Sequence, residues 1–384
     1  MRPDRKLRVV QLVARLGAAG GGAQAVARQI ALGLDRERFD STLCVSRVHL
    51  PRYSSVDVAR VTGELANGGV RYLHLKRRRR YDLWRWSGLV TFLRRARVDV
   101  IHAHQYPSNF WAAVLGRLAR VPVLVAHEHS WAFEGRPVRR FIDREVIARN
   151  SSVMIAVSEQ DRRRMIETEG IDPRCVTVLH NGIVGRDPTP GRDLRSEMGI
   201  PPHAPVIGMI GGLRPEKGIS ALLEAAAVLA PRHPGLKVLI AGEGDRSLLE
   251  PGGPLGLDDV LVPLGFRSDI PDVLAACDVA VCPSLREGSP LSVMEYMEAG
   301  IPIVASRVGG IPEVIHDGVH GRLVPPDDPA RLADAVTSML RDPAGSAAMG
   351  ARAQERRRRE FDLGGMINRL EDLYLELHAA RSPR

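Results

Sequence analysis

The chain has 384 residues, 44% of them hydrophobic, and its 54 lysines and arginines exceed its 45 aspartates and glutamates to give a net charge of +9. This length fits two or three globular domains, and the basic balance admits nucleic acid, anionic lipid or phosphorylated small molecules as partners, or simply solvated helix faces. Four scattered cysteines argue against a disulfide framework, and neither a signal-peptide pattern nor an apolar run of about 20 residues occurs, so we expect a cytoplasmic protein.

The first elements follow the pattern of a strand, a glycine-rich loop and a helix. An apolar strand is predicted over residues 7–13, the glycines lie within residues 17–22, and a helix follows over residues 23–32. Glycine allows unusual φ angles and a close approach of a ligand to the backbone, so this loop suits a phosphate. Its spacing is not G-x-G-x-x-G, which argues against a dinucleotide-binding dehydrogenase.

Further strands are predicted over residues 43–45 and 70–75, and the second of these leads into a basic stretch with tryptophans. The stretch contains Lys76, Arg77, Arg78, Arg79, Arg80, Trp84 and Trp86. Cations beside indole rings suit the surface of an anionic membrane, because the cations meet lipid phosphates and the rings lie at the interface. The alternative is a basic loop followed by a helix whose aromatic side chains pack into the core.

Two consecutive predicted strands, over residues 98–104 and 121–129, carry histidines at their carboxyl ends. These are His102, His104, His127 and His129. Ligands of open α/β sheets bind outside the carboxyl ends of the strands, so the histidines indicate a site. The alternative is a set of ordinary hydrogen-bonded imidazoles. An H-x-H pair places two side chains on one strand face, but no third ligand is indicated, so no metal site is predicted.

Strands over residues 153–157 and 176–182 complete a first series, and a proline-rich, charged stretch follows over residues 184–202. A domain boundary is expected there. We predict an N-terminal domain over residues 1–185, a second domain over residues 186–360, and a C-terminal helix over residues 361–384 that packs back on the first domain.

A second series of alternating strands and helices runs from residue 205 to residue 341. Strands are predicted over residues 205–212, 236–244, 260–265, 279–282, 303–306 and 321–324, with helices that include residues 219–230 and 329–341. Alternation of this kind in both halves predicts an α/β protein with two tandem doubly wound, Rossmann-like parallel sheets. Ligands are then expected in a cleft that the two domains face.

The most informative stretch is residues 287–295, between the strand at 279–282 and a helix that ends at Gly300. Ser289 is the expected N-cap and Pro290 the first helical residue. A helix N-terminus attracts an anion, whereas the flanking carboxylates of Glu287 and Glu295 are better suited to hydroxyl groups. A site that binds a phosphate between two carboxylates, each of which accepts hydrogen bonds from hydroxyl groups, would suit a nucleotide sugar.

Glu287 and Glu295, with seven residues between them, match the E-x7-E element of the family 4 retaining glycosyltransferases. The chain resembles this family over nearly its whole length, and the resemblance is most specific between residues 205 and 324. The other matching segments include Gly21-Gly22-Ala23-Gln24, His180-Asn181-Gly182, Arg214-Pro215-Glu216-Lys217-Gly218 and Gly309-Gly310-Ile311-Pro312-Glu313. The resemblance implies the GT-B fold, a nucleotide-diphosphate sugar as co-substrate, and no separate cofactor.

The resemblance also implies roles for individual residues. Glu287, Lys217 and His129 would be catalytic: Glu287 would contact hydroxyls of the sugar, Lys217 would neutralise the diphosphate, and His129 would lie near the transferred sugar. The donor would be bound by Glu295, Arg214, Gly288, Ser289, Pro290, Leu291, Gly21 and Gly22. Contacts to the acceptor or sugar would come from His102, His104, His127 and Asn181.

Two departures from the family pattern affect residues that would bind the diphosphate. Gly212 stands where the family commonly has an arginine, and Arg214 is the candidate replacement. Pro290 stands where glycine is frequent and has no N–H to donate. A lysine, a second cation and a helix N-terminus can stabilise a diphosphate leaving group without a metal, and front-face attack is the family's proposed route.

The expected function is therefore transfer of a hexose-type sugar to a glycan, lipid-linked or small-molecule acceptor. The alternative function is a non-catalytic module that binds nucleotide sugars or anions. We expect a cytoplasmic protein, with a peripheral position at the inner face of the plasma membrane if the basic stretch binds lipid. Nucleic acid is not expected as a partner.

Overall fold

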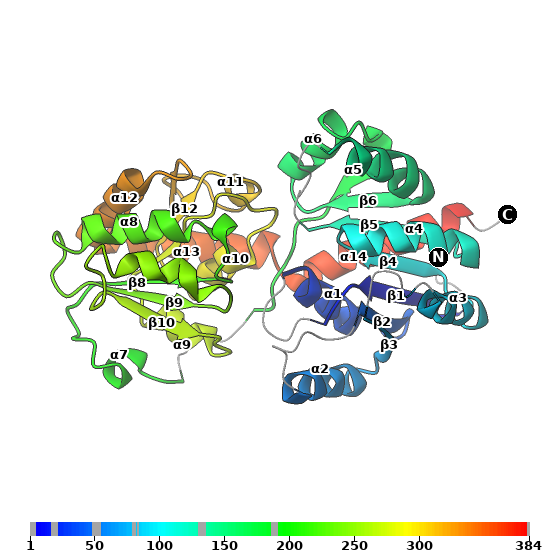
Figure 1. Ribbon diagram of the computed structural model, residues 1–384, viewed down its shortest axis with the longest axis horizontal. Coiled ribbons are helices and arrows are strands. Elements are labelled where there is room, and N and C mark those ends of the chain that lie inside the picture. The colour runs from blue at the N-terminus through cyan, green and yellow to red at the C-terminus, as the bar shows by residue number, and fades with distance from the viewer. Residues whose placement is uncertain are drawn as a thin grey trace. The chain divides into compact units, whose positions relative to one another are not determined.

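A computed structural model describes residues 5–16, 22–47, 55–78, 82, 84–129, 136–185 and 191–381. Contacts divide the chain into two compact units, each with its own parallel sheet (Figure 1). Unit 1 comprises Met1–Asn181 and Gly364–Arg384, and unit 2 comprises Gly182–Leu363. The predicted boundaries at residues 185 and 360 lie within a few residues of these divisions.

The sheet of unit 1 has seven parallel strands in the order β3-β2-β1-β4-β5-β6-β7. The strands are β1 Leu7–Val13, β2 Phe39–Arg47, β3 Arg71–Arg77, β4 Val100–His104, β5 Val123–Glu128, β6 Val153–Ala156 and β7 Val176–Val178. Chain order runs outward in one direction from β1 to β3 and in the other from β4 to β7. The junction of β1 and β4 is therefore the topological switch point, where ligands of such sheets bind at the carboxyl ends.

Helices cover both faces of this sheet because neighbouring residues of each strand point in opposite directions. Leu43 and Val45 of β2 pack against residues of two helices, whereas Cys44 between them packs with the helices of the other face. The helices between these strands include α1 Gly22–Gly33, α2 Ser55–Asn67, α3 Arg85–Arg95, α4 Tyr106–Ala119, α5 Pro137–Phe141, a π-helical segment Ile142–Ala148, and α6 Glu159–Glu167.

The C-terminal helix α14, Leu363–Arg381, belongs to unit 1 from Gly364 onward (Figure 1). The carboxylate of Glu371 accepts hydrogen bonds from the Asp35 backbone N–H at 2.6 Å and from Arg38 at 3.1 Å. The ring of Tyr374 makes an edge contact with Phe39 and is fully buried. These contacts bring the last helix of the chain against its first strands.

The sheet of unit 2 has six parallel strands in the order β10-β9-β8-β11-β12-β13, with its switch point between β8 and β11. The strands are β8 Val206–Ile210, β9 Lys237–Ala241, β10 Leu261–Gly265, β11 Val279–Cys282, β12 Ile303–Ser306 and β13 Arg322–Val324. The helices are α7 Leu194–Glu197, α8 Ile219–Leu229, α9 Ile270–Ala275, α10 Leu291–Ala299, α11 Ile311–Val314, α12 Pro329–Arg341 and α13 Pro343–Glu360.

The two faces of this sheet are again covered by different helices. Val279 and Val281 of β11 pack with α8 and α12, while Ala280 and Cys282 pack with α9, α10 and α13. The predicted fold class, two tandem doubly wound parallel sheets, is therefore confirmed. Helix α13 was not predicted, because its arginine-rich sequence has little apolar periodicity; one of those arginines, Arg357, is buried against Glu298.

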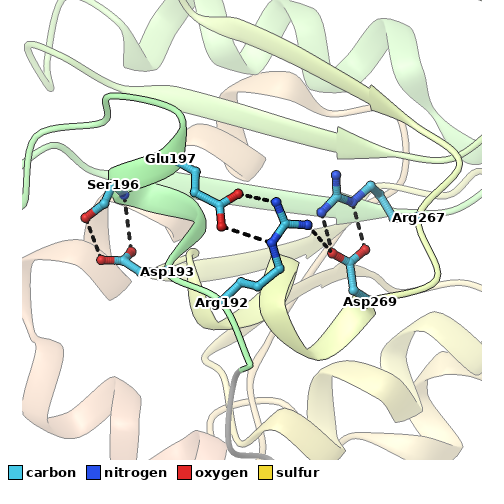
Figure 2. Close-up of polar contacts among 6 residues, drawn as sticks. All are labelled: Arg192, Asp193, Ser196, Glu197, Arg267 and Asp269. Atoms are coloured by element: carbon cyan, nitrogen blue, oxygen red, sulfur yellow. Dashed lines mark hydrogen bonds and ion pairs between the residues drawn. The ribbon is translucent and has the colours of Figure 1, made fainter.

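A surface network joins the start of unit 2 to the segment between β10 and α9 (Figure 2). Arg192 donates to Glu197 at 2.9 Å and lies 3.6 Å from Asp269, which also accepts a hydrogen bond from Arg267 at 2.8 Å. Asp193 caps the short helix α7 by accepting the backbone N–H of Ser196. About half of the Arg192 side chain is exposed, so this network adds little stability in water.

Candidate active site

Two charged side chains of unit 2 meet beyond the carboxyl ends of β8 and β11, the strands of the switch point. Lys217 follows β8 and Glu287 follows β11, and the ammonium nitrogen of Lys217 contacts Oε1 of Glu287. The hydroxyl of Ser284 donates to the same oxygen at 3.0 Å. The two side chains are 15% and 10% exposed, so the ion pair is largely shielded from water. Electrostatic interactions are stronger in such a setting than at an open surface.

Backbone contacts that only glycine permits hold the segments that carry this pair. Gly309 has a φ of +55°, and a Cβ there would lie 1.5 Å from the carbonyl oxygen of Glu287. Gly218, directly after Lys217, has a φ of +70°, and a Cβ there would lie 1.9 Å from the carbonyl oxygen of Pro283. Both segments therefore pack backbone against backbone, which fixes the backbone positions from which Lys217 and Glu287 extend.

The helix after Glu287 begins one residue later than predicted. Ser289 was expected to be the N-cap, but Pro290 occupies that position with an extended ψ of 92°, and α10 begins at Leu291. The correction arises because an extended proline can offer its carbonyl to Met294 N–H, at 3.2 Å, without entering the helix. The Ser289 hydroxyl does not cap the helix, is buried, and has no hydrogen-bond partner among the described residues.

The N-terminus of α10 retains the properties of an anion site despite this shift. No side chain among the described residues caps it, and its first amides precede the first intrahelical bond. The amides and the positive end of the helix dipole favour a phosphate close to Gly288 and Leu291. Glu295 lies one turn further along α10 and is partly exposed.

The second cation of the predicted diphosphate site lies close to the glycine it was expected to compensate. The guanidinium Nε of Arg214 is 3.6 Å from the position that a Cβ of residue 212 would occupy. Arg214 is 55% exposed and pairs with Glu216 at 3.2 Å, so its charge is solvated and can reorient. The Arg214 guanidinium therefore lies within van der Waals contact of position 212.

In unit 1 the four predicted histidines lie together at the carboxyl ends of β4 and β5. His104 Nδ1 is 2.8 Å from His129 Nε2, and His102 Nε2 is 3.1 Å from His127 Nδ1. The rings of His102 and His104 stack with centroids 4.3 Å apart, and those of His127 and His129 with centroids 4.1 Å apart. The H-x-H spacing explains the stacking, since residues i and i+2 of a strand share a face.

Two further residues continue these hydrogen bonds. His104 Nε2 lies 2.8 Å from Oε1 of Gln11, and His102 Nδ1 lies 2.6 Å from the hydroxyl of Tyr374. The Gln11 amide nitrogen donates to that hydroxyl at 3.1 Å. Gln11 and Tyr374 are fully buried. Neither was predicted as a site residue: the only local signal of Gln11 is a polar side chain within an apolar strand, and Tyr374 lies 363 residues away in the sequence.

All four imidazoles are held neutral by their surroundings. Burial lowers the pKa of His129 to about 3. Burial and the neighbouring histidines lower the pKa values of His102, His104 and His127 well below the usual value. Burial also raises the pKa of the Tyr374 hydroxyl, so that group stays protonated. The cluster consequently works through hydrogen bonds and not through charge at neutral pH.

The pairing of β4 with β5 brings a third imidazole next to His102 and His104, so that three possible metal ligands lie together, which the sequence did not indicate. Nitrogen atoms of His102, His104 and His127 lie within 4.8 Å of one another, because β5 places His127 opposite His104. His102 and His104 use both ring nitrogens in hydrogen bonds with the other histidines, Gln11 and Tyr374, and His127 uses Nδ1. The contacts therefore describe a hydrogen-bonded cluster, and we assign no metal to it.

The remaining predicted site residues are distributed over both units. Gly22 is the exposed first residue of α1, and Gly21 lies outside the described residues. Asn181 is buried at the end of unit 1, and its Oδ1 has no hydrogen-bond partner in the described part of the chain. Ser284 was not predicted, although a serine three residues before Glu287 is a natural partner for its carboxylate.

The basic–aromatic stretch is divided between surface and core. Trp84 is 67% exposed, and Lys76 and Arg78 are also exposed. Arg77 and Trp86, in contrast, are each 3% exposed and stack with 4.4 Å between guanidinium carbon and ring centroid, so assigning them to a membrane surface was wrong. The cation is stabilised by the indole face inside the core. Arg79 and Arg80 lie outside the described residues.

Among the helices of the described ranges, none is both long enough and apolar enough to cross a bilayer.

Two family models match the chain, one in each half. Residues 20–184 match the model described as Glycosyltransferase Family 4, and residues 204–342 match Glycosyl transferases group 1. Among curated relatives, a D-inositol 3-phosphate glycosyltransferase of Corynebacterium efficiens is 31% identical over 328 residues, which cover 77% of this chain and 75% of the relative. A relative of the same name from Saccharomonospora viridis is 31% identical over a region that covers 73% of this chain and 71% of the relative.

Solved structures share the fold across almost the whole chain. The Anabaena protein Alr3699/HepE in complex with UDP-glucose has a TM-score of 0.82 at 22% identity and covers 96% of this chain and 100% of that chain. The sucrose-phosphate synthase of Thermosynechococcus elongatus has a TM-score of 0.80 at 20% identity and covers 98% and 100%.

Proposed function

The chain belongs to glycosyltransferase family 4 and is a glycosyltransferase with the GT-B fold, and from this premise we propose that it moves a hexose-type sugar from a nucleotide-diphosphate sugar to an acceptor, with retention of configuration. The observation that supports this most is the Lys217–Glu287 pair beside the uncapped N-terminus of α10. It combines a cation and backbone amides for a diphosphate with a carboxylate for sugar hydroxyls.

Departure of the diphosphate is the step that these groups would assist. Cleavage of the bond between the anomeric carbon and the diphosphate leaves additional negative charge on the phosphate oxygens. Lys217, Arg214 and the backbone N–H groups of Gly288, Ser289 and Leu291 would stabilise that charge, which is electrostatic catalysis of the leaving group. The proposed reaction needs no divalent metal, because the positive charge comes from the protein.

Glu287 and Glu295 would have different tasks in donor binding. Glu287 is held by Lys217 and Ser284, so its carboxylate is suited to accepting hydrogen bonds from the sugar. Glu295, one turn along α10, would accept the ribose hydroxyls of the nucleotide. We infer front-face attack, in which the leaving phosphate accepts the proton of the acceptor hydroxyl. His129, His127 and Asn181 would contact the sugar or the acceptor, whereas the ring nitrogens of His102 and His104 are already hydrogen-bonded within the cluster.

The name of the curated relatives supplies a specific candidate for the acceptor. Two of them are named D-inositol 3-phosphate glycosyltransferases, and a phosphorylated cyclitol is a small polar acceptor of the class expected from the sequence. UDP-glucose is a first donor to test, since the Anabaena structure contains it. A glycan or a lipid-linked sugar is the other class of acceptor.

We also propose a peripheral contact with an anionic membrane through the exposed part of the basic stretch. Trp84, Lys76 and Arg78 present an indole ring and two cations to solvent, the combination that binds anionic headgroups. Co-sedimentation with vesicles that contain phosphatidylglycerol, for wild type and Trp84→Ala, tests this contact. No binding by the wild type would end the membrane proposal without affecting the proposed transfer.

Transfer itself is tested with the full chain and a panel of UDP-, GDP- and ADP-sugars. Donor binding should raise the melting temperature, and transfer to D-inositol 3-phosphate or to a lipid-linked sugar should release nucleotide diphosphate with EDTA present. Glu287→Ala should retain most of the donor-induced shift but reduce transfer by roughly 100-fold or more. Glu224→Ala, an exposed glutamate on α8, is the matched control. Normal transfer by Glu287→Ala would contradict the role of that carboxylate.

A further inference from the structure

The four histidines, Gln11 and Tyr374 form one continuous chain of hydrogen bonds inside unit 1. In order, the chain runs from His127 to His102, Tyr374, Gln11, His104 and His129, with the five donor–acceptor distances between 2.6 and 3.1 Å. Its two ends are unused: His127 Nε2 and His129 Nδ1 are buried and have no hydrogen-bond partner among the described residues.

The amide of Gln11 gives the chain a direction. Its nitrogen donates to the Tyr374 oxygen, so the Tyr374 hydroxyl donates to His102 Nδ1. His102 must then carry its proton on Nε2 and donate it to His127 Nδ1, which leaves a proton on His127 Nε2. Along this branch, each neutral imidazole accepts on one nitrogen and donates on the other.

The other branch is determined in the same way. The carbonyl oxygen of Gln11 accepts from His104 Nε2–H, so His104 Nδ1 accepts from His129 Nε2–H. His129 consequently ends the chain with an unprotonated Nδ1. All four histidines therefore share the Nε2–H tautomer; a reversed Gln11 amide would give all four the Nδ1–H tautomer.

We propose that Gln11 and Tyr374 are positioning residues that set these tautomers, so that His129 presents the lone pair of Nδ1 to a hydroxyl group of the ligand. The assignment rests on the proposed function for the identity of that ligand, a sugar or a sugar acceptor. A buried acceptor without a partner is unfavourable, and a hydroxyl donor from the ligand supplies the missing bond. His127 Nε2–H at the opposite end is the complementary donor.

The tautomers themselves are tested by NMR of the full chain labelled with ¹⁵N-histidine, with the ring signals assigned residue by residue at neutral pH. The expected wild-type result is the Nε2–H tautomer for all four histidines. Nδ1–H as the main tautomer at any of the four histidines, or at all of them, would overturn the proposal. This measurement needs no activity, so it separates failure of the tautomer assignment from failure of the proposed transfer.

Tyr374→Phe tests the link between the two branches. It keeps the aromatic ring but removes the hydroxyl that bridges Gln11 and His102, so reversal of the Gln11 amide should cost little. His104 and His129 should then populate both tautomers, and kcat should fall about twofold with KM for the donor unchanged, since one hydrogen bond imposes about a fivefold bias. Unchanged signals of His104 and His129 would contradict the link.

Gln11→Glu gives a second and different pattern. A carboxylate only accepts, so the Tyr374 hydroxyl would donate to it and then accept from His102. His102 and His127 should switch to Nδ1–H while His104 and His129 keep Nε2–H; a common change in all four would contradict the direction of the chain. Tyr296→Phe is the matched control, because Tyr296 is a buried tyrosine of unit 2 whose hydroxyl bonds to the backbone and not to a histidine. It should leave the four signals unchanged.

Discussion

The two units have the same kind of sheet topology, but the polar residues at their strand ends are charged in unit 2 and neutral in unit 1. Each has a parallel sheet with a switch point, and polar residues gather there at the strand ends. Unit 2 places charges at this point, Lys217 and Glu287, beside a helix N-terminus. Unit 1 places four neutral imidazoles at the ends of β4 and the adjacent β5, connected to Gln11 of β1 and to Tyr374. The fold therefore determines where a site lies, whereas the side chains determine whether it interacts with a ligand through charges or through neutral hydrogen bonds.

The largest expected difference between the units is their response to acid. In the folded state the pKa values of His102, His104, His127 and His129 are lowered, so the unfolded chain takes up their protons first. The stability contributed by the neutral forms is complete above about pH 6.5 and declines below it, by up to about 1.4 kcal/mol per pH unit for each histidine.

A buried glutamate beside the cluster acts in the opposite direction. Burial raises the pKa of Glu128 to about 7, so its contribution is present below its unfolded pKa and is lost as the pH rises through 7. One glutamate offsets only part of the effect of four histidines. Hydrogen exchange measured at pH 7, 6 and 5 should therefore show unit 1 opening at a higher pH than unit 2. Loss of protection in unit 2 first would contradict this balance.

Replacement of Lys217 should lower the transfer rate and weaken donor binding in unit 2. Lys217→Ala leaves Glu287 largely buried without its cation and removes a charge from the proposed leaving-group site. We expect a fall in kcat of about 10²–10³-fold, with a smaller donor-induced rise in melting temperature. Lys237→Ala, at the start of β9, removes an equivalent charge from the exposed surface and is the control. Equal activity of the two variants would remove Lys217 from the mechanism.

Exposed ion pairs should contribute little to the free energy of unfolding in either unit. Arg192 of unit 2 pairs with Glu197 and Asp269 (Figure 2), and Arg174 of unit 1 pairs with Asp172 at 2.6 Å. Each arginine is at least half exposed, so Arg192→Ala and Arg174→Ala should each change the free energy of unfolding by no more than about 1 kcal/mol. Urea titration of each variant measures this. A loss well above that value in either would show a structural role that exposure does not suggest.

Much of the fold follows from local pattern. The strand at residues 7–13 and the helix at residues 329–341 are predicted to the residue, because apolar periodicity and terminal prolines act over a few positions. The histidine cluster follows from the position of these residues at strand ends, where such sheets bind ligands, whereas the roles of Lys217 and Glu287 are implied by the family resemblance. The start of α10 was predicted one residue too early, as proline is compatible with either side of a helix boundary.

By itself, the sequence determined the alternation of strands and helices, the two sheets and the family to which the chain belongs. The tertiary structure decided which polar groups meet. Tyr374 reaches Gln11 across 363 residues of sequence, and Arg77 stacks on Trp86 in the core instead of facing solvent. Periodicity records which face of an element is buried, but it holds no information about the partner that buries it. The direction of the histidine chain therefore depends on a glutamine and a tyrosine whose contact only folding creates.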